Sequence, residues 1–177
     1  MKKYICIFFF IPMSKVAFCQ DVIINGINKN RLLTWDDFTG KPDKSSLHDA
    51  NTYWDLNYSF QRFTFKEDTA KITGFSVKLE LNEKLSWLKQ GKQTNYLLKH
   101  EQGHFDIGLI CQTELIKQLN NTVFFKTDFQ NKIQTVFANI YDRYIQLGIK
   151  YDEETNHSEN QQSQDNWDAF FAKELNR

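Results

Sequence analysis

The sequence predicts an α+β domain in which an N-terminal antiparallel β-sheet is followed by three helices. Apolar residues alternate with polar ones in stretches between positions 54 and 81, a pattern typical of half-buried strands. Between positions 94 and 175 they recur at every third or fourth residue, which is typical of amphipathic helices. A length of 177 residues allows one domain and leaves little room for a second.

Two strands are expected to form a hairpin. The first begins at Trp54, and its inward positions are Trp54, Leu56, Tyr58 and Phe60. The second spans 70–81 and follows a turn at Glu67 and Asp68. Its alternation shifts at Gly74, which predicts a β-bulge. Residues 22–27 are expected to add an edge strand.

Three helices are expected in the second half of the chain. The first spans about 94–119 and carries a broad apolar stripe. The second is predicted to begin at the capping box 127–130 (Thr-x-x-Gln) and to stop at Gly148. The third is predicted to begin at a similar box, 158–161 (Ser-x-x-Gln), after a short loop over 150–157.

Residues 1–19 are predicted to be a signal peptide, because two lysines precede the apolar run 4–13 and a small-x-small cleavage site ends at Cys19. The run is too short to span a bilayer. We therefore expect residues 20–177 to form one exported domain, periplasmic or secreted, with no integral membrane segment. A lipid anchor on Cys19 is less favoured, because bulky Phe18 stands where such sites need a small residue.

Composition excludes several classes of protein. Lys plus Arg and Asp plus Glu number 22 each, so no basic surplus favours nucleic acid as a partner. A hydrophobic content of 41% can fill a core, which argues against a disordered chain. Signal cleavage would leave Cys111 alone, so no internal disulfide is expected, and a buried apolar role is favoured over a reactive thiol.

The first predicted helix contains His100-Glu101-Gln102-Gly103-His104, the H-E-x-x-H pattern. At 3.6 residues per turn the two imidazoles stand about 6 Å apart along the axis, so one ion can bind to both. Zinc accepts neutral imidazole and keeps a position open for water in catalytic sites, and a neighbouring carboxylate can take that water's proton. The pattern predicts Zn²⁺ bound by His100 and His104, Glu101 as general base, and a zincin-like arrangement.

A catalytic zinc site needs a third protein ligand. The metzincin pattern is excluded, because Ile107 and Ile110 stand where Gly and His are required, and 128–148 holds no Glu for a thermolysin-like ligand. The remaining candidates are His48, His157, Glu153 and Glu154. We favour His157, because the dipole of the helix that follows it disfavours imidazolium and leaves a neutral nitrogen to bind metal. His48 lies in a polar stretch and is expected to be solvated.

Residues around the motif are expected to shape the site without binding the metal or to pack in the core. Gly103 and Gly108 each cost a helix about 1 kcal/mol relative to Ala, so backbone or substrate is expected to approach closely there. Asp106 is rotated away from the two histidines, which favours a supporting hydrogen bond over ligation. The strand 75–81 either pairs with an extended peptide or is an interior strand. Tyr151 either steadies an oxyanion or is packed.

Residues 97–107 (LLKHEQGHFDI) and 151–157 (YDEETNH) resemble the bacterial domain-of-unknown-function family 922, described as secreted zinc-dependent proteases. Residues 33–40 are similar to that family's opening, so the resemblance covers almost the whole mature chain. It implies that His100, His104 and His157 bind zinc and that Glu101 is the catalytic carboxylate. Ser158 departs from the pattern, which has Gly after the histidine.

The expected function is therefore that of an exported zinc-dependent metallopeptidase. Zinc would lower the pKa of its water towards about 7, Glu101 would accept the proton, and the hydroxide would attack an amide of a peptide or protein substrate. Two alternatives stay open. One is a non-catalytic envelope binding module stabilised by zinc, with a fourth ligand such as His48, and the other is a zinc hydrolase acting on a non-peptide bond. The oligomeric state is left open.

Overall fold

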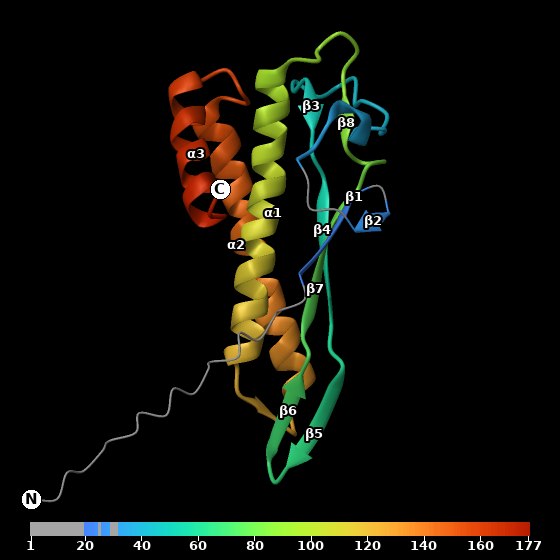
Figure 1. Ribbon diagram of the computed structural model, residues 1–177, viewed down its shortest axis with the longest axis vertical. Helices are drawn as coiled ribbons and strands as arrows, with labels where there is room; N and C mark the ends of the chain where they lie inside the picture. The colour runs from blue at the N-terminus through green and yellow to red at the C-terminus, as the bar shows by residue number, and fades with distance from the viewer. Residues whose placement is uncertain (1–19, 25, 29–31) are drawn as a thin grey trace, which may run out of the picture.

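The computed structural model describes residues 20–24, 26–28 and 32–177, and the predicted signal peptide lies outside them (Figure 1). A narrow sheet lies on one side of a long helix, α1 (Asn95–Asn121), and two further helices pack against α1 (Figure 1). These are α2 (Phe129–Thr155) and α3 (Gln161–Glu174). The predicted α+β class, with strands first and three helices after them, is confirmed.

The main sheet has four strands in the order β2, β1, β7, β4. Their bounds are β2 Ile27–Asn28, β1 Gln20–Ile24, β7 Ser76–Leu81 and β4 Trp54–Ser59. The predicted hairpin is present, because β4 and β7 are antiparallel with Leu56 opposite Leu79. Strand β1 runs parallel to β7, so the sheet is not purely antiparallel.

The prediction of an edge strand at 22–27 is wrong, because β1 lies between β2 and β7. The outer strands of this sheet are the two-residue β2 and the longer β4. Strand β7 has hydrogen-bonded neighbours on both sides, so the alternative that it pairs with a substrate peptide is also wrong. It is an interior strand.

The hairpin continues past the main sheet as β5 (Arg62–Lys66) and β6 (Thr69–Thr73), which pair with β9 (Phe124–Phe125). Its turn lies at Glu67 and Asp68, as predicted, and Glu67 has a left-handed φ of 53°. The expected single strand 70–81 is instead two strands, interrupted at 74–75. Gly74 has a φ of 70°, a left-handed value that a side chain would strain, which explains why the chain changes direction there.

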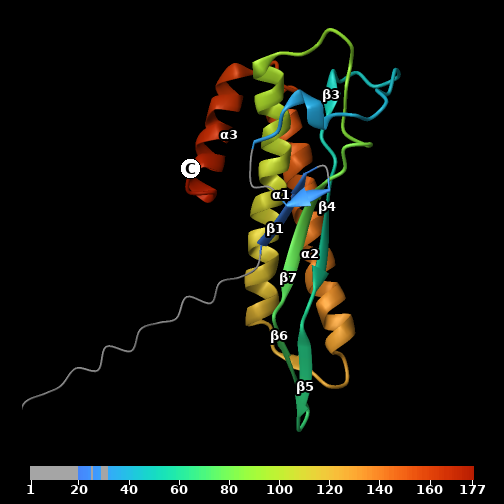
Figure 2. The same ribbon diagram turned by 45° about the vertical axis from the view of Figure 1, so that its right-hand side comes forward.

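A smaller group of elements lies at the opposite end of the long axis from the β5–β6 hairpin (Figure 2). It comprises β3 (Ala50–Asn51), which pairs with β8 (Trp87–Leu88), and the short 3₁₀ helix η1 (Trp35–Asp37). Strand β3 also contacts α1. This contact brings residues 48–54 beside the part of the helix that carries the motif.

The core lies between the sheet and α1 and continues between the three helices. Val77, Leu79 and Leu81 are buried, whereas the residues between them are half-exposed, as the alternation predicts. A Cβ on Gly108 would lie 2.9 Å from Leu79 Cδ1, so this glycine lets the sheet approach the helix. Cys111 is fully buried, and burial raises the pKa of its thiol to about 12. Its predicted role as a buried apolar residue is confirmed.

The first helix matches its prediction closely. Its N-cap is Thr94, whose Oγ1 accepts a hydrogen bond from the backbone N–H of Leu97 at 3.0 Å. The helix ends at Asn121, two residues beyond the expected end at Leu119. Within the described residues, no helix is both long and apolar enough to cross a membrane.

The predicted limits of the other helices are wrong in three places. Helix α2 has Asp128 as its N-cap with no side-chain cap bond, so the 127–130 capping box is not used. It also continues past Gly148 and stops only at Asn156, whose φ of 47° is left-handed. Helix α3 begins after Asn160, whose side chain accepts from Ser163, and not at Ser158. The predicted loop 150–157 is therefore mostly the last turn and a half of α2.

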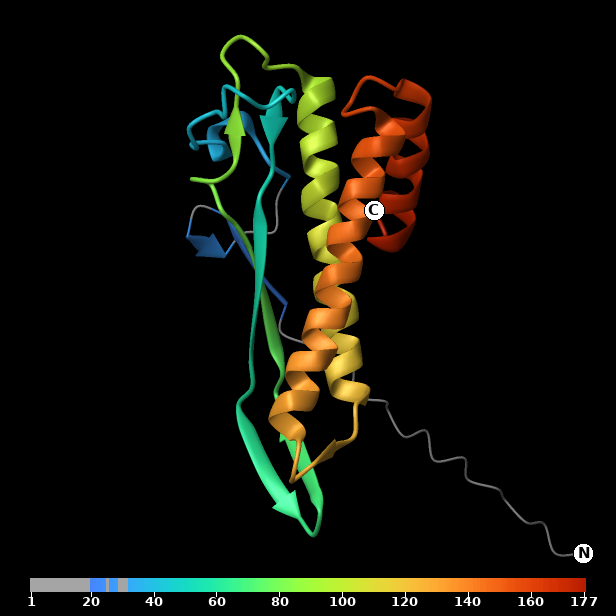
Figure 3. The ribbon, with the colours of Figure 1, turned by 180° about the vertical axis from the view of Figure 1, so that it is seen from behind.

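Helices α1 and α2 lie side by side and antiparallel along the long axis (Figure 3). The start of α1 is therefore level with the end of α2. Helix α3 packs against both of them at this same end. Three helices and the segment around β3 meet there, although they are far apart in the sequence.

Candidate metal centre

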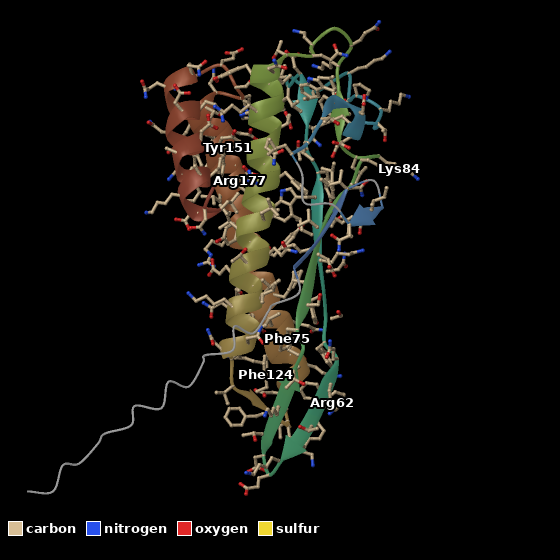
Figure 4. The ribbon with its side chains drawn as sticks, in the orientation of Figure 1. Arg62, Phe75, Lys84, Phe124, Tyr151 and Arg177 are labelled. Atoms are coloured by element: carbon tan, nitrogen blue, oxygen red, sulfur yellow. The ribbon has the colours of Figure 1, made fainter. Side chains whose placement is uncertain are left out.

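A cavity of about 290 Å³ opens at this end of the molecule. One wall is the first half of α1, a second is the last part of α2, and a third is the segment 48–54. Tyr151 lies at this level, on the side of α1 that faces the other helices (Figure 4). His100, Glu101 and His104 line the cavity together with His157. All four residues that the sequence selects therefore reach one site.

The two histidines of the motif converge on a single carboxylate oxygen. Oδ1 of Asp152 lies 3.2 Å from Nε2 of His100 and 2.9 Å from Nε2 of His104. One ligand atom from each of these three residues lies within 4.8 Å of the others. The three side chains can therefore hold a metal ion.

The spacing of these atoms fits a tetrahedral ion. Zinc ligands stand about 2.0–2.1 Å from the metal, which places neighbouring ligand atoms about 3.3 Å apart. The two distances to Asp152 are close to that value. Two imidazoles and one carboxylate, with a cavity beside them, are a donor set typical of a catalytic transition-metal site.

The charges in the cluster also favour a cation. Burial would raise the pKa of Asp152, but hydrogen bonds and charge interactions with His100 and His104 outweigh it and hold that pKa far below its usual value. Burial lowers the pKa of His104, yet Asp152, followed by Glu101, raises it above the ordinary value overall. The site therefore stabilises positive charge between the imidazoles and the carboxylate, whether a proton or a metal ion carries it.

His157 lies at the rim of the cluster. Its Nδ1 is 3.4 Å from Oδ1 of Asp152, its side chain is 42% exposed, and its ring centre lies 3.8 Å from that of His48. It is not in the group of three potential ligands, so its assignment as the third ligand stays a prediction. His48 is exposed, as expected, and lines the cavity beside it.

Ser158, which stands where the family pattern has Gly, lies in a turn of left-handed backbone together with His157. Asn156, His157 and Ser158 all have positive φ, with values of 47°, 50° and 76°. Left-handed backbone favours glycine, so a glycine after the histidine would relieve strain at this turn. Ser158 keeps the same conformation without that advantage.

Glu101 is buried beside the histidines with one specific partner. The hydroxyl of Thr52 donates to Oε2 of Glu101 at 2.6 Å, and Thr52 follows β3 directly. Both residues line the cavity. The contact with Thr52 thus fixes the carboxylate that the motif places next to the potential metal ligands.

Tyr151 supports both imidazoles from behind. Its ring stacks on that of His100 with centres 4.6 Å apart and meets His104 edge-on at 5.0 Å. Its hydroxyl is buried and donates to the backbone oxygen of His100 at 3.1 Å. The packed alternative is confirmed, and the oxyanion alternative is wrong because the hydroxyl does not reach the cavity.

The two helix glycines make room for side chains and not for substrate. A Cβ on Gly103 would lie 2.3 Å from the Tyr151 hydroxyl oxygen, so this glycine admits the tyrosine. Asp106 accepts hydrogen bonds from Gln102 at 2.8 Å and from Arg177, the last residue of the chain (Figure 4). Its expected supporting role, without ligation, is confirmed.

Asp152 is a potential ligand that the sequence pattern does not reveal. The pattern predicts that the second helix ends at Gly148, which places Asp152 in a loop. Tyr144, Gly148 and Asp152 are spaced by four residues, so a longer helix would have put Asp152 on the cavity face. Thr52 carries no comparable signal, because its partner Glu101 is 49 residues away.

Comparison with known families gives one match. A family described as "Bacterial protein of unknown function (DUF922)" matches residues 37–158. No curated protein and no solved structure matches the chain. The matched segment contains the motif, Thr52, Asp152 and His157, and it ends before α3.

Proposed function

The chain belongs to the bacterial family of unknown function DUF922, and we propose that it is an exported zinc-dependent metallopeptidase. One observation carries the proposal: the buried carboxylate of Glu101 lines the same cavity as the converging group of His100, His104 and Asp152. We assign these three as zinc ligands and keep His157 as a further candidate at the rim. The export step is the predicted role of residues 1–19.

Zinc bound there would supply a Lewis acid that polarises the scissile carbonyl and lowers the pKa of water towards about 7. Glu101 accepts the proton of the attacking water and returns it to the leaving amine. Thr52 donates to Oε2 of Glu101, so we assign the proton transfer to Oε1. The same hydrogen bond prevents the carboxylate from rotating away from the metal ligands.

The cavity lining supports peptides with apolar side chains as substrates. Leu97, Tyr141, Ile145 and Ile149 line it. Its ionisable groups include the carboxylates of Asp49, Glu101 and Asp152, and no Lys or Arg is among the lining residues. Apart from the metal centre itself, the lining offers no Lys or Arg to pair with an acidic residue next to the scissile bond, so such peptides should be poorer substrates than apolar ones.

The test compares Glu101→Gln with the wild type and with Glu153→Gln, an exposed carboxylate of α2. Zinc content is measured by mass spectrometry and turnover with a mixed peptide library. We expect Glu101→Gln to retain zinc and to lose about 10²–10⁴-fold in turnover, whereas Glu153→Gln stays active. Unchanged turnover in Glu101→Gln contradicts the assigned role.

Parallel assays separate the two alternatives. Ester and glycan substrates are presented to the same variants. Hydrolysis of these without peptide cleavage favours a non-peptide hydrolase. Stoichiometric zinc with no hydrolysis of any substrate favours the non-catalytic binding module.

A further inference from the structure

Helix α3 reaches the metal cluster through one buried amide. Gln164 is fully buried, and its Oε1 lies 3.1 Å from Nδ1 of His100. The segment that matches the family ends at residue 158, so this contact comes from outside it.

The orientation of the Gln164 amide follows from its other partners. Its Nε2 lies 2.9 Å from Oδ1 of Asp168 and 2.7 Å from the hydroxyl oxygen of Tyr151. An ionised carboxylate can only accept, so the amide nitrogen must face Asp168. Asp168 is held in place by an ion pair with Lys99 of α1. The amide oxygen is thereby turned towards His100.

This orientation determines which nitrogen of His100 carries the proton. An amide oxygen only accepts, so Nδ1 of His100 must be the N–H that donates to it. In the neutral ring, Nε2 then presents a lone pair, and this atom faces Oδ1 of Asp152 at 3.2 Å. Two acceptors in direct contact need a cation between them, which is the arrangement that a metal ion requires.

We propose that Gln164, oriented by Asp168, is a positioning residue that holds His100 in the tautomer that binds metal through Nε2. The proposal deepens the proposed function and rests on its metal site. It makes α3 part of the centre, because His100 is held between Tyr151 on its face and Gln164 at its edge. A partner of this kind typically contributes 10–100-fold to metal affinity.

The first test is the dissociation constant for zinc, measured by chelator competition. We expect Gln164→Leu to weaken zinc binding about 10–100-fold. The matched control is Gln162→Leu, the same substitution at an exposed position of α3, which should leave affinity unchanged. A folded Gln164→Leu protein with wild-type affinity overturns the proposal.

Exchanging the side-chain types of positions 164 and 168 distinguishes the proposed positioning role from a general loss of packing. In Gln164→Glu alone, the new carboxylate faces that of Asp168. Their repulsion displaces the acceptor of His100, so zinc binding should weaken. In Gln164→Glu with Asp168→Asn, residue 164 again accepts from His100, and the amide at 168 supplies the donor. We expect the double variant to recover most of the lost affinity. If a folded double variant recovers no zinc affinity, the proposed role of Gln164 and Asp168 is contradicted.

A third measurement needs no substitution. Nitrogen-15 spectra of the histidines in zinc-loaded wild type should show His100 protonated at Nδ1 and bound through Nε2. Coordination through Nδ1 overturns the inference, even if Gln164→Leu fails to fold. All three readouts are independent of peptide cleavage, so an inactive protein that shows them would refute the peptidase assignment alone. A wild type that binds no zinc refutes the metal site and this inference together.

Discussion

Nε2 of His104 lies 2.9 Å from Oδ1 of Asp152, although the two residues are 48 positions apart. The contact exists because α1 and α2 are antiparallel, so that the start of one is level with the end of the other. It links the sequence motif to a carboxylate on a second helix.

Asp152→Asn should weaken zinc binding more than the roughly 10–100-fold that loss of an outer partner costs, because it removes the anionic donor facing both histidines. His157→Ala should cost less, since His157 lies at the exposed rim. Chelator competition on the two variants measures both effects. The opposite order of affinities would identify His157 as the third ligand and Asp152 as its partner.

Thr52→Val should reduce turnover about 10–100-fold and leave zinc affinity unchanged. The substitution keeps the shape of the side chain and removes the hydroxyl that donates to Glu101 Oε2 at 2.6 Å. A buried carboxylate without this donor loses its fixed orientation, and a hydrogen bond to a charged group is worth about 1.5–3 kcal/mol. Thr52→Ser keeps the donor and should retain activity. Equal activities for the valine and serine variants would show that the contact has no catalytic role.

Gly103→Ala should destabilise the protein, although alanine is favoured over glycine by about 1 kcal/mol within a helix. The new Cβ would lie 2.3 Å from the Tyr151 hydroxyl oxygen and 2.9 Å from Phe171 Cε2. Both neighbours are buried and cannot move aside cheaply, and overpacking of this kind costs about 1–3 kcal/mol. Gly148→Ala is the control, because its nearest contact is His104 Nδ1 at 3.9 Å. Urea unfolding should show opposite signs for the two variants.

The stability of the folded domain should depend on Cys111 at alkaline pH. Burial raises the pKa of its thiol to about 12 in the folded state, whereas an unfolded cysteine ionises near 8.5. Above about 8.5 the unfolded chain therefore binds fewer protons than the folded one, and the free energy of unfolding falls as pH rises. By pH 10 this contribution should reach about 2 kcal/mol.

The measurement compares wild type with Cys111→Ala in urea at pH 8 and pH 10. Other alkaline groups are common to both proteins, so the difference between the two isolates the thiol. The wild type should lose about 2 kcal/mol more than the variant over this interval. A constant difference would mean that the thiol is accessible to solvent.

Local periodicity predicted those parts of the fold that depend on neighbours in the chain. Leu56 and Leu79 are placed correctly because alternation alone decides which face of a strand is buried. The parallel pairing of β1 with β7 was missed, because no local pattern records which distant strand lies alongside. The glycine at 148 predicts a helix end, yet Gly148 lies inside α2 next to His104, where a side chain is not required for packing.

The same distinction applies to the site. His100 and His104 could be identified because four residues of one helix bring them to one face. Asp152, Thr52 and Gln164 reach them from other elements, so their roles depend on tertiary packing. The zinc and the reaction stay predictions that the experiments above address, and the export of the chain stays a prediction from residues 1–19.

The antiparallel packing of α1 and α2 determines which residue of α2 lies beside the motif. Asp152 reaches the motif only if the number of residues from the motif to the end of α1 is compatible with the number from the start of α2 to Asp152. One residue inserted within α2 before position 152 would turn everything after it by about 100° and advance it by about 1.5 Å, taking the carboxylate out of reach. The connection at 122–128 is itself held by the pairing of β9 with β6, so length changes within either helix must come in compensating sets.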